Sequence, residues 1–367
     1  MHHSGLPCHG RDWSLTLLAI AIAAGADLTI HEMAPTFVRL LQDPEAEVRS
    51  AAAMKLSDFS QMLTPEMVMT LIMPCVTEMC DDQSQHVRLP PHHLLHSLLS
   101  FLLPNHTFSL DRTALFHALQ VRASLASVVM GLAPIIGKDA TIEQLLPLFL
   151  KLLKDEFPEV RLNIIGTLPA ANTNLGVELL ATSLLPAVEE LAEDRQWRVR
   201  LAVIDYMPPL AAQLGVDFFE ERLCDLCVRW LRDCVYTIRE SAIENVRRLT
   251  ELFGVNWAAT KLFPKVLQTR ESSNYLFRLT ALSTVASLSA VVGTEVLYRT
   301  LLPIALGMVT DSVPNVRFNV AKTLQQLIPM LDPGMVATQV KPKLLVLSED
   351  TDKDVQYFAR KALQSCG

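Results

Sequence analysis

The chain has 367 residues, of which 50% are hydrophobic and 6% aromatic, and its formal net charge is −7. This negative charge argues against a nucleic-acid partner, which would need a basic stripe on the surface. A single globular core of this length would normally divide into domains, whereas a chain of stacked helical repeats grows by addition. We therefore expect one elongated, all-helical chain.

The first part of the chain carries an apolar run from Leu17 to Ala26, which ends in Ala24-Gly25-Ala26. Such a run resembles the core of a signal peptide followed by a cleavage site. However, Arg11 is the single Lys or Arg before it, and Leu17 aligns with Leu56 in the repeat described below. We interpret residues 1–27 as an atypical N-terminus, formed by the second helix of a truncated repeat, with secretion as the alternative.

From residue 28 onward an apolar residue followed by Arg recurs, and from Arg122 every step is 39 residues. Most of these Arg residues have an acidic residue six positions before them and a Pro fourteen positions before them. Apart from Arg122, which follows an interruption of the period, Ser272 and Asp225 are the exceptions at these two positions. A period of about 40 residues is typical of a two-helix solenoid repeat. The pairs are Val48-Arg49, Val121-Arg122, Val160-Arg161, Val199-Arg200, Ile238-Arg239, Phe277-Arg278 and Val316-Arg317, followed by Val355-Gln356.

Each repeat is predicted to contain an apolar helix A, a short turn that starts at the Asp, and a helix B that starts near the apolar-Arg pair. Asp suits such a turn because its carboxylate accepts hydrogen bonds from backbone N–H groups at a helix start. Pro within helix A should bend it. Stacked in successive repeats, the acidic and basic side chains should form a ladder of charge-assisted hydrogen bonds. Its predicted members are Asp155, Arg161, Asp194, Arg200, Asp233, Arg239, Asp311 and Arg317.

Residues 89–121 interrupt the period and have a different composition. Val87-Arg88 already stands one period after Arg49, so Val121-Arg122 duplicates it at the far end of an insertion. The insertion contains a His cluster (His92, His93 and His96) and the glycosylation sequon that begins at Asn105. Its apolar run is too short to cross a bilayer, and we expect no membrane partner. We interpret the insertion as a translated intron or splice artefact and, if expressed, as a loop between two sets of repeats, residues 28–88 and 122–367.

The sequence predicts neither a metal site nor an enzyme. Cys224 and Cys227 form the single C-x-x-C pattern, but a zinc site needs a second pair of ligands nearby. The chain carries no phosphate-binding, dinucleotide-binding, nucleophile-elbow or zinc-protease motif. The repeated Asp and Arg occur in every unit, which argues against a catalytic role. We therefore expect no cofactor and no catalysis.

Several stretches closely resemble one family of helical-repeat proteins. They include residues 137–143, 157–165, 197–202, 211–216 and 315–322. In these stretches the chain resembles the HEAT-repeat scaffold, or A, subunit of protein phosphatase 2A. The resemblance covers residues 28–88 and 122–365 and does not extend across the insertion. It implies an α-solenoid, or superhelix, of HEAT repeats with two antiparallel helices in each 39-residue repeat.

The resemblance also implies partners. In that family the C-terminal repeats hold the catalytic phosphatase subunit on the turns between helices A and B, and regulatory B-type subunits bind chiefly the N-terminal repeats, most of which are missing here. It implies a cytoplasmic protein, with the nucleus as a second compartment. The alternative is an importin-like transport adaptor, although Trp shows no period here. Mapped onto this chain, the residues that bind the catalytic subunit are Trp197, Arg198, Val235, Tyr236, Asn274, Tyr275, Asn315, Lys353 and Asp354.

Overall fold

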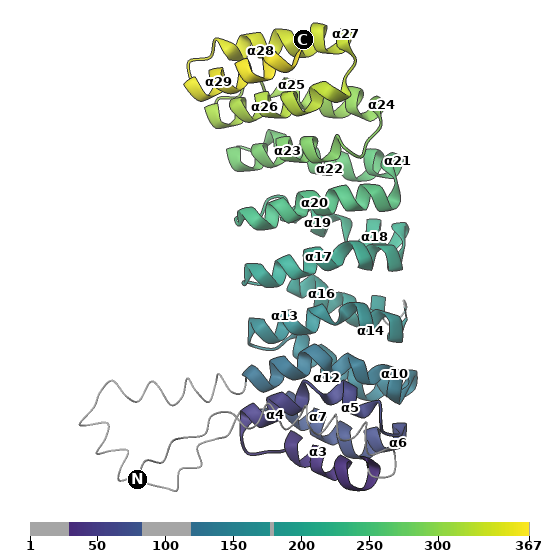
Figure 1. Ribbon diagram of the computed structural model, residues 1–367. Coiled ribbons are helices and arrows are strands. Elements are labelled where there is room, and N and C mark those ends of the chain that lie inside the picture. Colours follow the sequence, from purple (N-terminus) through teal and green to yellow (C-terminus); the bar gives the residue numbers. More distant parts are fainter. Residues whose placement is uncertain (1–28, 83–118, 177–179, 367) are drawn as a thin grey trace, which may run out of the picture. The chain divides into compact units, whose positions relative to one another are not determined.

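A computed structural model describes residues 29–82, 119–176 and 180–366, and it contains helices without any strand in these ranges. The chain divides into two compact units, residues 1–202 and 203–367. In each unit, pairs of helices follow one another along the chain as the 39-residue period predicts (Figure 1). This confirms the predicted all-helical repeat architecture. Residues 1–27 and nearly all of the insertion at 89–121 lie outside the described residues.

Unit 1 contains the first helix pairs. Its helix A segments are η1 (Thr29–Met33) with α3 (Ala34–Leu41), α6 (Pro65–Met67) with η2 (Val68–Ile72) and α7 (Met73–Cys80), α11 (Lys138–Ala140) with η4 (Thr141–Leu145) and α12 (Leu146–Leu153), and η5 (Leu180–Leu184) with α16 (Leu185–Leu191). Its helix B segments are α4 (Ala46–Ala53) with α5 (Leu56–Ser60), residues 119–128 with η3 (Val129–Leu132) and α10 (Ala133–Ile136), α13 (Pro158–Gly166) with α14 (Leu168–Leu175), and the start of α17 (Trp197–Leu214), in which the division between the units falls.

Unit 2 continues with the same elements. Its helix A segments are α18 (Val216–Arg222) with α19 (Cys224–Trp230), α21 (Val255–Trp257) with η6 (Ala258–Leu262), α22 (Phe263–Leu267) and η7 (Gln268–Glu271), α24 (Thr294–Val296) with η8 (Leu297–Leu301) and α25 (Leu302–Gly307), and α27 (Pro333–Met335) with η10 (Val336–Val340) and α28 (Lys341–Ser348). Its helix B segments are α20 (Tyr236–Phe253), α23 (Tyr275–Leu288), α26 (Pro314–Leu327) with η9 (Ile328–Met330), and α29 (Lys353–Leu363) with η11 (Gln364–Cys366).

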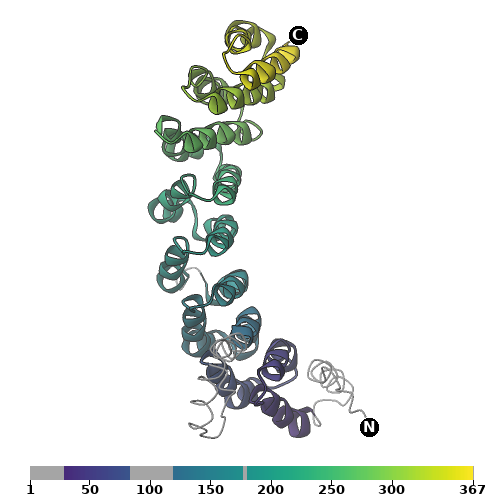
Figure 2. The same ribbon diagram turned by 90° about the vertical axis from the view of Figure 1, so that its left-hand side faces the viewer.

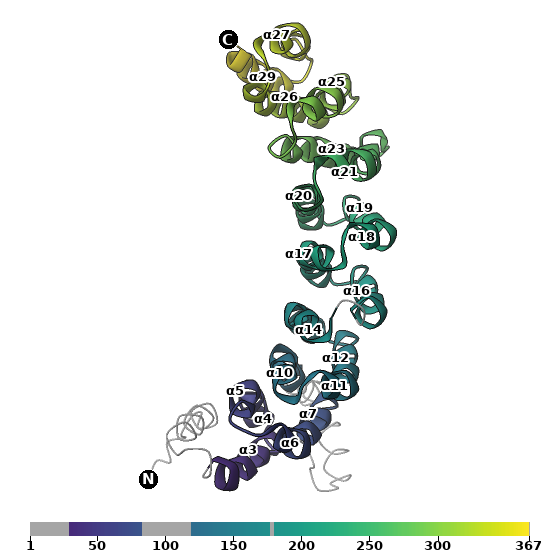
Figure 3. The same ribbon diagram turned by 90° about the vertical axis from the view of Figure 1, so that its right-hand side faces the viewer.

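The helices of each unit form two layers. Figure 2 views many helices nearly end-on, and Figure 3 shows the opposite side. In unit 1, α10 and α14 lie in one layer and α12 and α16 in the other (Figure 3). In unit 2, α20 lies apart from α18 and α19 in the same way (Figure 3). The turns from helix A to helix B therefore lie at one edge of the stack in each unit.

Helix B buries one apolar stripe against its neighbours. In α20 the stripe consists of Ile238, Ala242, Val246 and Leu249, which are at most 1% exposed. Complete burial of a Val, Leu or Ile side chain stabilises the fold by about 1.5–3 kcal/mol. The stripe thus ties each helix B to its own helix A and to the adjacent repeats.

Proline interrupts helix A at the same place in most repeats. In α12, Pro147 is the second residue, and the π turn η4 ends immediately before this helix. Because Pro has no N–H, it cannot make the hydrogen bond that would continue a regular helix, and a π turn accommodates the break. Where Asp225 replaces the Pro, α18 and α19 follow one another without a π turn. The Pro register therefore marks a fixed irregularity of the repeat.

Glycine opens the turn from one repeat to the next. Gly137, Gly176, Gly215 and Gly254 have φ between 83° and 91°, a region that L-residues with side chains rarely adopt. They are spaced by the same 39 residues as the Arg positions. Gly293 holds the next position of the series with φ of −75°. The sequence carries this signal in addition to the Arg, Asp and Pro positions on which the repeat prediction rests.

Candidate functional site

In each unit the turns from helix A to helix B form an edge that is the candidate site, and an Asp organises most of these turns. In these turns the Asp carboxylate accepts a hydrogen bond from the backbone N–H two residues later, at 2.8–2.9 Å. This bond satisfies a donor that a helix start leaves unpaired. Helix B then begins two residues before the apolar-Arg pair, as Trp197, Tyr236 and Tyr275 show. These aromatic side chains were expected in the turns themselves, so the structure corrects their position to the first residue of helix B.

The Arg of each apolar-Arg pair stabilises the turn that precedes its helix by a side-chain hydrogen bond. Its Nη1 donates to the carbonyl of the residue six positions earlier, at 2.6–2.9 Å from Arg49, Arg161, Arg200, Arg239, Arg278 and Arg317. Gln356 takes over this role in the last repeat, where its Nε2 donates to the carbonyl of Asp350 at 2.6 Å. The repeated polar residue therefore closes its own turn.

The rest of the guanidinium reaches the following repeat. In five repeats Nε lies 2.6–3.0 Å from the carboxylate of an Asp, and these side chains are 8–15% exposed. The Asp is 33 residues further along the chain, because it precedes the next Arg by six of the 39 positions. Such partly buried, charge-assisted pairs are stronger than exposed surface pairs. The pairs are Arg49–Asp82, Arg122–Asp155, Arg161–Asp194, Arg278–Asp311 and Arg317–Asp350.

The pairs differ in their electrostatics. The hydrogen bond from Arg317 lowers the pKa of the Asp350 carboxyl. Burial alone would raise the pKa of Asp311, but hydrogen bonds from Arg278 and from the backbone bring it below its usual value. For Asp155, in contrast, burial dominates and raises the pKa. The charged forms of Asp311 and Asp350 are thus better stabilised, chiefly by the Arg of the preceding repeat, than that of Asp155.

The insertion interrupts the sequence of one turn but not its Arg contacts. Asp82 receives the side chain of Arg49, as the Asp of a repeat should. The carbonyl of Asp82 then accepts a bond of 3.2 Å from Nη1 of Arg122, forty residues later. Arg122 also pairs with Asp155. Arg122 therefore takes the position of the repeat Arg. The prediction of an insertion falls mostly on residues 83–118, which lie outside the described part of the chain.

In unit 1, the predicted partner-binding residues Trp197 and Arg198 begin α17. Trp197 is half-buried, whereas Arg198 is exposed. The guanidinium of Arg198 lies over the indole ring, with 5.5 Å between its carbon and the ring centroid. A cation stacked on an aromatic ring is a favourable contact and holds the ring in place. Together the two side chains form a preorganised aromatic and cationic surface at this turn.

In unit 2, the next two turns present tyrosines. Tyr236 is 66% exposed, and its hydroxyl donates to Glu240 at 3.4 Å. Tyr275 is 38% exposed and follows Asn274, whose side chain caps α23 by accepting from the N–H of Leu276 at 3.0 Å. Val235, before Tyr236, is half-buried. The structure thus leaves both rings accessible to a partner.

The last two turns present polar residues. Asn315 is half-buried, and its carbonyl and side-chain oxygens accept bonds from Nδ2 of Asn319 at 2.8 and 3.0 Å. Lys353 and Asp354 are exposed at the start of α29. Tyr357, which is 62% exposed one helical turn later, is a further exposed aromatic residue that the sequence prediction did not include. The sequence signal for Tyr357 was its position directly after Gln356, which holds the place of the repeat Arg in the last repeat.

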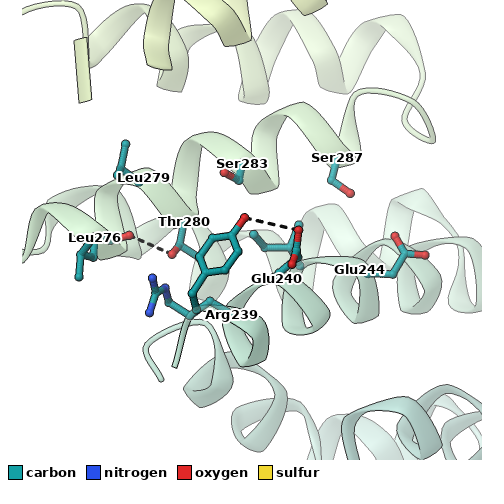
Figure 4. Close-up of a pocket in the computed structure, with 10 residues that line it drawn as sticks. Arg239, Glu240, Glu244, Leu276, Leu279, Thr280, Ser283 and Ser287 are labelled. Atoms are coloured by element: carbon teal, nitrogen blue, oxygen red, sulfur yellow. Dashed lines mark hydrogen bonds between the residues drawn. The ribbon is translucent and has the colours of Figure 1, made fainter. Parts of the chain in front are cut away.

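A shallow groove lies beside Tyr236 between the helices α20 and α23. Its volume is about 370 Å³, and Ile243, Leu276 and Leu279 contribute its apolar lining. Figure 4 shows Arg239 and Glu240 on the α20 side. Thr280 and Ser283 are small side chains on the α23 side, which leaves room between the helices.

The described residues contain no cluster of three or more His, Cys, Asp or Glu able to hold a metal ion. Cys224 and Cys227 are buried in α19, and burial raises the pKa of both thiols. Metal binding requires thiolates, so this environment disfavours it. The apolar stretch Leu119–Ile136 has the length and composition of a membrane span, but half of it is buried within the repeats.

Comparison with known families matches two groups of repeats. The PPP2R1A-like HEAT repeat family matches residues 26–91 and 138–215, and the general HEAT repeat family matches residues 301–331. The human beta isoform of the 65 kDa regulatory subunit of serine/threonine-protein phosphatase 2A is 45% identical over 154 residues, which are 41% of this chain and 20% of that protein. The corresponding regulatory subunit of yeast (Saccharomyces cerevisiae) PP2A is 37% identical over 65 residues, 16% of this chain and 10% of that protein. The matched segments thus span a fifth or less of these two relatives.

Among solved structures, the karyopherin Kap121p bound to the extreme C-terminus of the protein phosphatase Cdc14p superposes with a TM-score of 0.56. This superposition covers 100% of the present chain and 38% of the karyopherin, at 14% sequence identity. A separate structure of Kap121p gives a TM-score of 0.52. At this identity the likeness shows a shared helical-repeat fold alone.

Proposed function

The chain is a HEAT-repeat protein related to the 65 kDa regulatory subunit of protein phosphatase 2A, and from this premise we propose that it is a non-catalytic scaffold that holds the phosphatase catalytic subunit. The contacts proposed are the starts of helices B in the C-terminal repeats. The observation that carries the proposal is the exposure of Tyr236 and Tyr275, at 66% and 38%, directly after turns that are closed by Arg239 and Arg278. Large aromatic side chains held on a rigid frame are typical of residues that dominate binding energy.

A binding measurement with purified catalytic subunit tests this proposal. We expect Trp197→Ala and Tyr275→Ala each to weaken binding at least tenfold, because loss of such a contact costs about 2 kcal/mol or more. Met330→Ala is the matched control, since Met330 is 39% exposed but lies in η9, at the end of helix B. Circular dichroism of each variant checks that the helices are intact.

The proposal is contradicted if the catalytic subunit binds Trp197→Ala, Tyr275→Ala and the control Met330→Ala equally tightly. Failure of the intact chain to bind the catalytic subunit, together with recovery of nuclear transport cargo, would support the importin-like adaptor instead. Either result would leave the fold described above unchanged.

Regulatory B-type subunits are the second proposed class of partner. A scaffold brings two proteins together, so the complex of chain and catalytic subunit should retain a regulatory subunit in size-exclusion chromatography. A complex that excludes all regulatory subunits tested would restrict the proposal to the catalytic subunit. We also propose a cytoplasmic and nuclear location, in keeping with the free cysteines of the described part, and cell fractionation tests it.

A further inference from the structure

One position of the Asp and Arg ladder lacks its acid. Arg278 illustrates the complete arrangement, with Nε 2.6 Å from one carboxylate oxygen of Asp311 and Nη2 2.8 Å from the other. Arg239 stands one repeat earlier, and the residue 33 positions after it is Ser272. A serine hydroxyl cannot supply the second oxygen or the negative charge. The Nε and Nη2 donors of Arg239, which form the fork of its guanidinium, therefore lack the carboxylate that an Asp would provide at this position.

Arg239 is nonetheless as buried as its counterparts. The residue is 6% exposed, and its Nη1 donates to the carbonyls of Asp233 and Cys234 at 2.9 and 3.2 Å. Its guanidinium carbon lies 5.7 Å from the centroid of the Tyr236 ring. Nε and Nη2 have no carboxylate acceptor among the described residues. A cation removed from water without a counter-ion is unfavourable, so this fork is a ready-made site for an anion.

Ser272 occupies the backbone position from which an Asp would reach the fork. Its carbonyl accepts from Nη1 of Arg278 at 2.9 Å, as the carbonyl of Asp311 accepts from Arg317 at 2.8 Å. Its hydroxyl accepts from the N–H of Asn274 at 3.2 Å, which is the bond that an Asp carboxylate makes in the other turns. Ser272 is half-exposed, in the turn before α23. The hydroxyl of Ser272 thus belongs to a turn with the same hydrogen bonds as the turns that contain an Asp, and it remains accessible from solvent.

We propose that Ser272 is a phosphorylation site and that its phosphate replaces the missing carboxylate on Arg239. A protein kinase would supply the phosphoryl group from a nucleoside triphosphate. A bond forms between Oγ of Ser272 and the γ-phosphorus, the bond from that phosphorus to the bridging oxygen breaks, the nucleoside diphosphate leaves, and the hydroxyl proton passes to a base of the kinase. The product carries a charge of about −1.5 to −2 at neutral pH and three acceptor oxygens.

The burial of Arg239 favours a phosphate on the chain itself over a carboxylate from a partner. A partner side chain would have to reach a guanidinium whose residue is 6% exposed, whereas Ser272 already lies at the ladder position. The phosphate would join the repeat of α20 to the repeat of α23 at the position that an ion pair takes between α23 and the following repeat. Phosphorylation would therefore stiffen the stack locally. This inference does not rest on the proposed function, because it concerns contacts within the chain.

The test uses the full chain with phosphoserine incorporated at position 272 during translation. We expect the melting temperature of the modified chain to rise by about 3 °C or more. Phosphoserine at Ser273 is the matched control, because Ser273 is exposed, adjacent in the same turn, and not in the register of the ladder Asp. The shift at position 272 should be lost in Arg239→Gln and reduced in Arg239→Lys, which keeps the charge but not the planar fork.

Equal shifts for phosphate at 272 and 273, or no shift at 272, would overturn the inference. If Arg239→Gln does not fold, Arg239→Lys alone decides whether the shift depends on the fork. Mass spectrometry of the chain recovered from cells with phosphatases inhibited is the second readout. Phosphate at Ser272 would support the assignment, and complete absence of phosphate at this residue would overturn it. A partner that binds less tightly to Ser272→Asp, without any shift from phosphoserine, would assign the fork to a partner carboxylate instead.

Discussion

Replacement of Ser272 by Asp should stabilise the second unit. The new carboxylate would meet Nε and Nη2 of Arg239, in the geometry of Arg278 and Asp311, whose bonds are 2.6 and 2.8 Å long. Arg239 is 6% exposed, so most of the cost of burying its charge is already present in the wild type. Hydrogen bonds between charged groups contribute about 1.5–3 kcal/mol each, and the desolvation of the new Asp offsets part of this. We expect a net gain of about 1–2 kcal/mol.

Urea unfolding followed by circular dichroism measures this gain. With a slope of about 1–3 kcal/mol per molar urea, the midpoint should rise by roughly 0.3 M or more. Repeat proteins need not unfold in one step, so the transition of residues 203–367 is compared between variants rather than converted to an absolute stability. Ser272→Asn is the control, because its side chain accepts the turn hydrogen bond without adding charge. The reasoning fails if Asp and Asn at this position are equally stable.

The pH dependence gives an independent check of the same pair. In the two ladder pairs nearest the C-terminus the Asp has a lowered pKa, as Asp311 and Asp350 show, and we expect the same for an Asp at position 272. The unfolded chain then binds more protons than the folded chain between the folded pKa and the unfolded value of about 3.9. The gain from Ser272→Asp should be complete above the unfolded pKa and disappear as the pH falls through the folded one. A gain that persists at lower pH would not come from an ion pair.

Four other substitutions give sharp expectations. Asp350→Asn should lower the free energy of unfolding of the last repeats by about 2 kcal/mol at neutral pH, because it breaks a partly buried pair with Arg317, and the loss should shrink in acid. Asp155→Asn should cost less than Asp350→Asn in the same urea assay, since burial raises the pKa of Asp155 and already penalises its charge. Gly254→Ala should destabilise by about 1 kcal/mol because φ is 91°, although nothing lies within 4 Å of the added carbon. Gly293→Ala, at a φ of −75°, should be neutral in thermal melts, and an equal loss at both glycines would refute the backbone explanation.

The period predicted most of the fold because the same few contacts recur in each repeat. Apolar residues at fixed positions after the Arg predicted the buried stripe of helix B, and the Asp predicted its turn. Stacking of the repeats also predicted the ladder of Asp and Arg, although the offset of 33 residues that joins each Arg to the Asp of the following repeat was not predicted. The π turns at the Pro register and the degree of exposure of Tyr236 were not predicted either, because they depend on how neighbouring segments pack. Such contacts between repeats follow from spacing only when two repeats are considered together.

The contacts that hold the stack also position the proposed binding residues. Tyr236 and Tyr275 each begin a helix B immediately after a turn that is closed by Arg239 or Arg278. Arg278 is tied to the following repeat through Asp311, whereas Arg239 has Ser272 in place of the acid. The junction between the repeats of the two tyrosines is therefore held by packing without the ion pair that supports the next junction. A charge added at Ser272 would act at this point and change how firmly the two aromatic side chains are held relative to each other, which connects the stability of the stack to its ability to bind a partner.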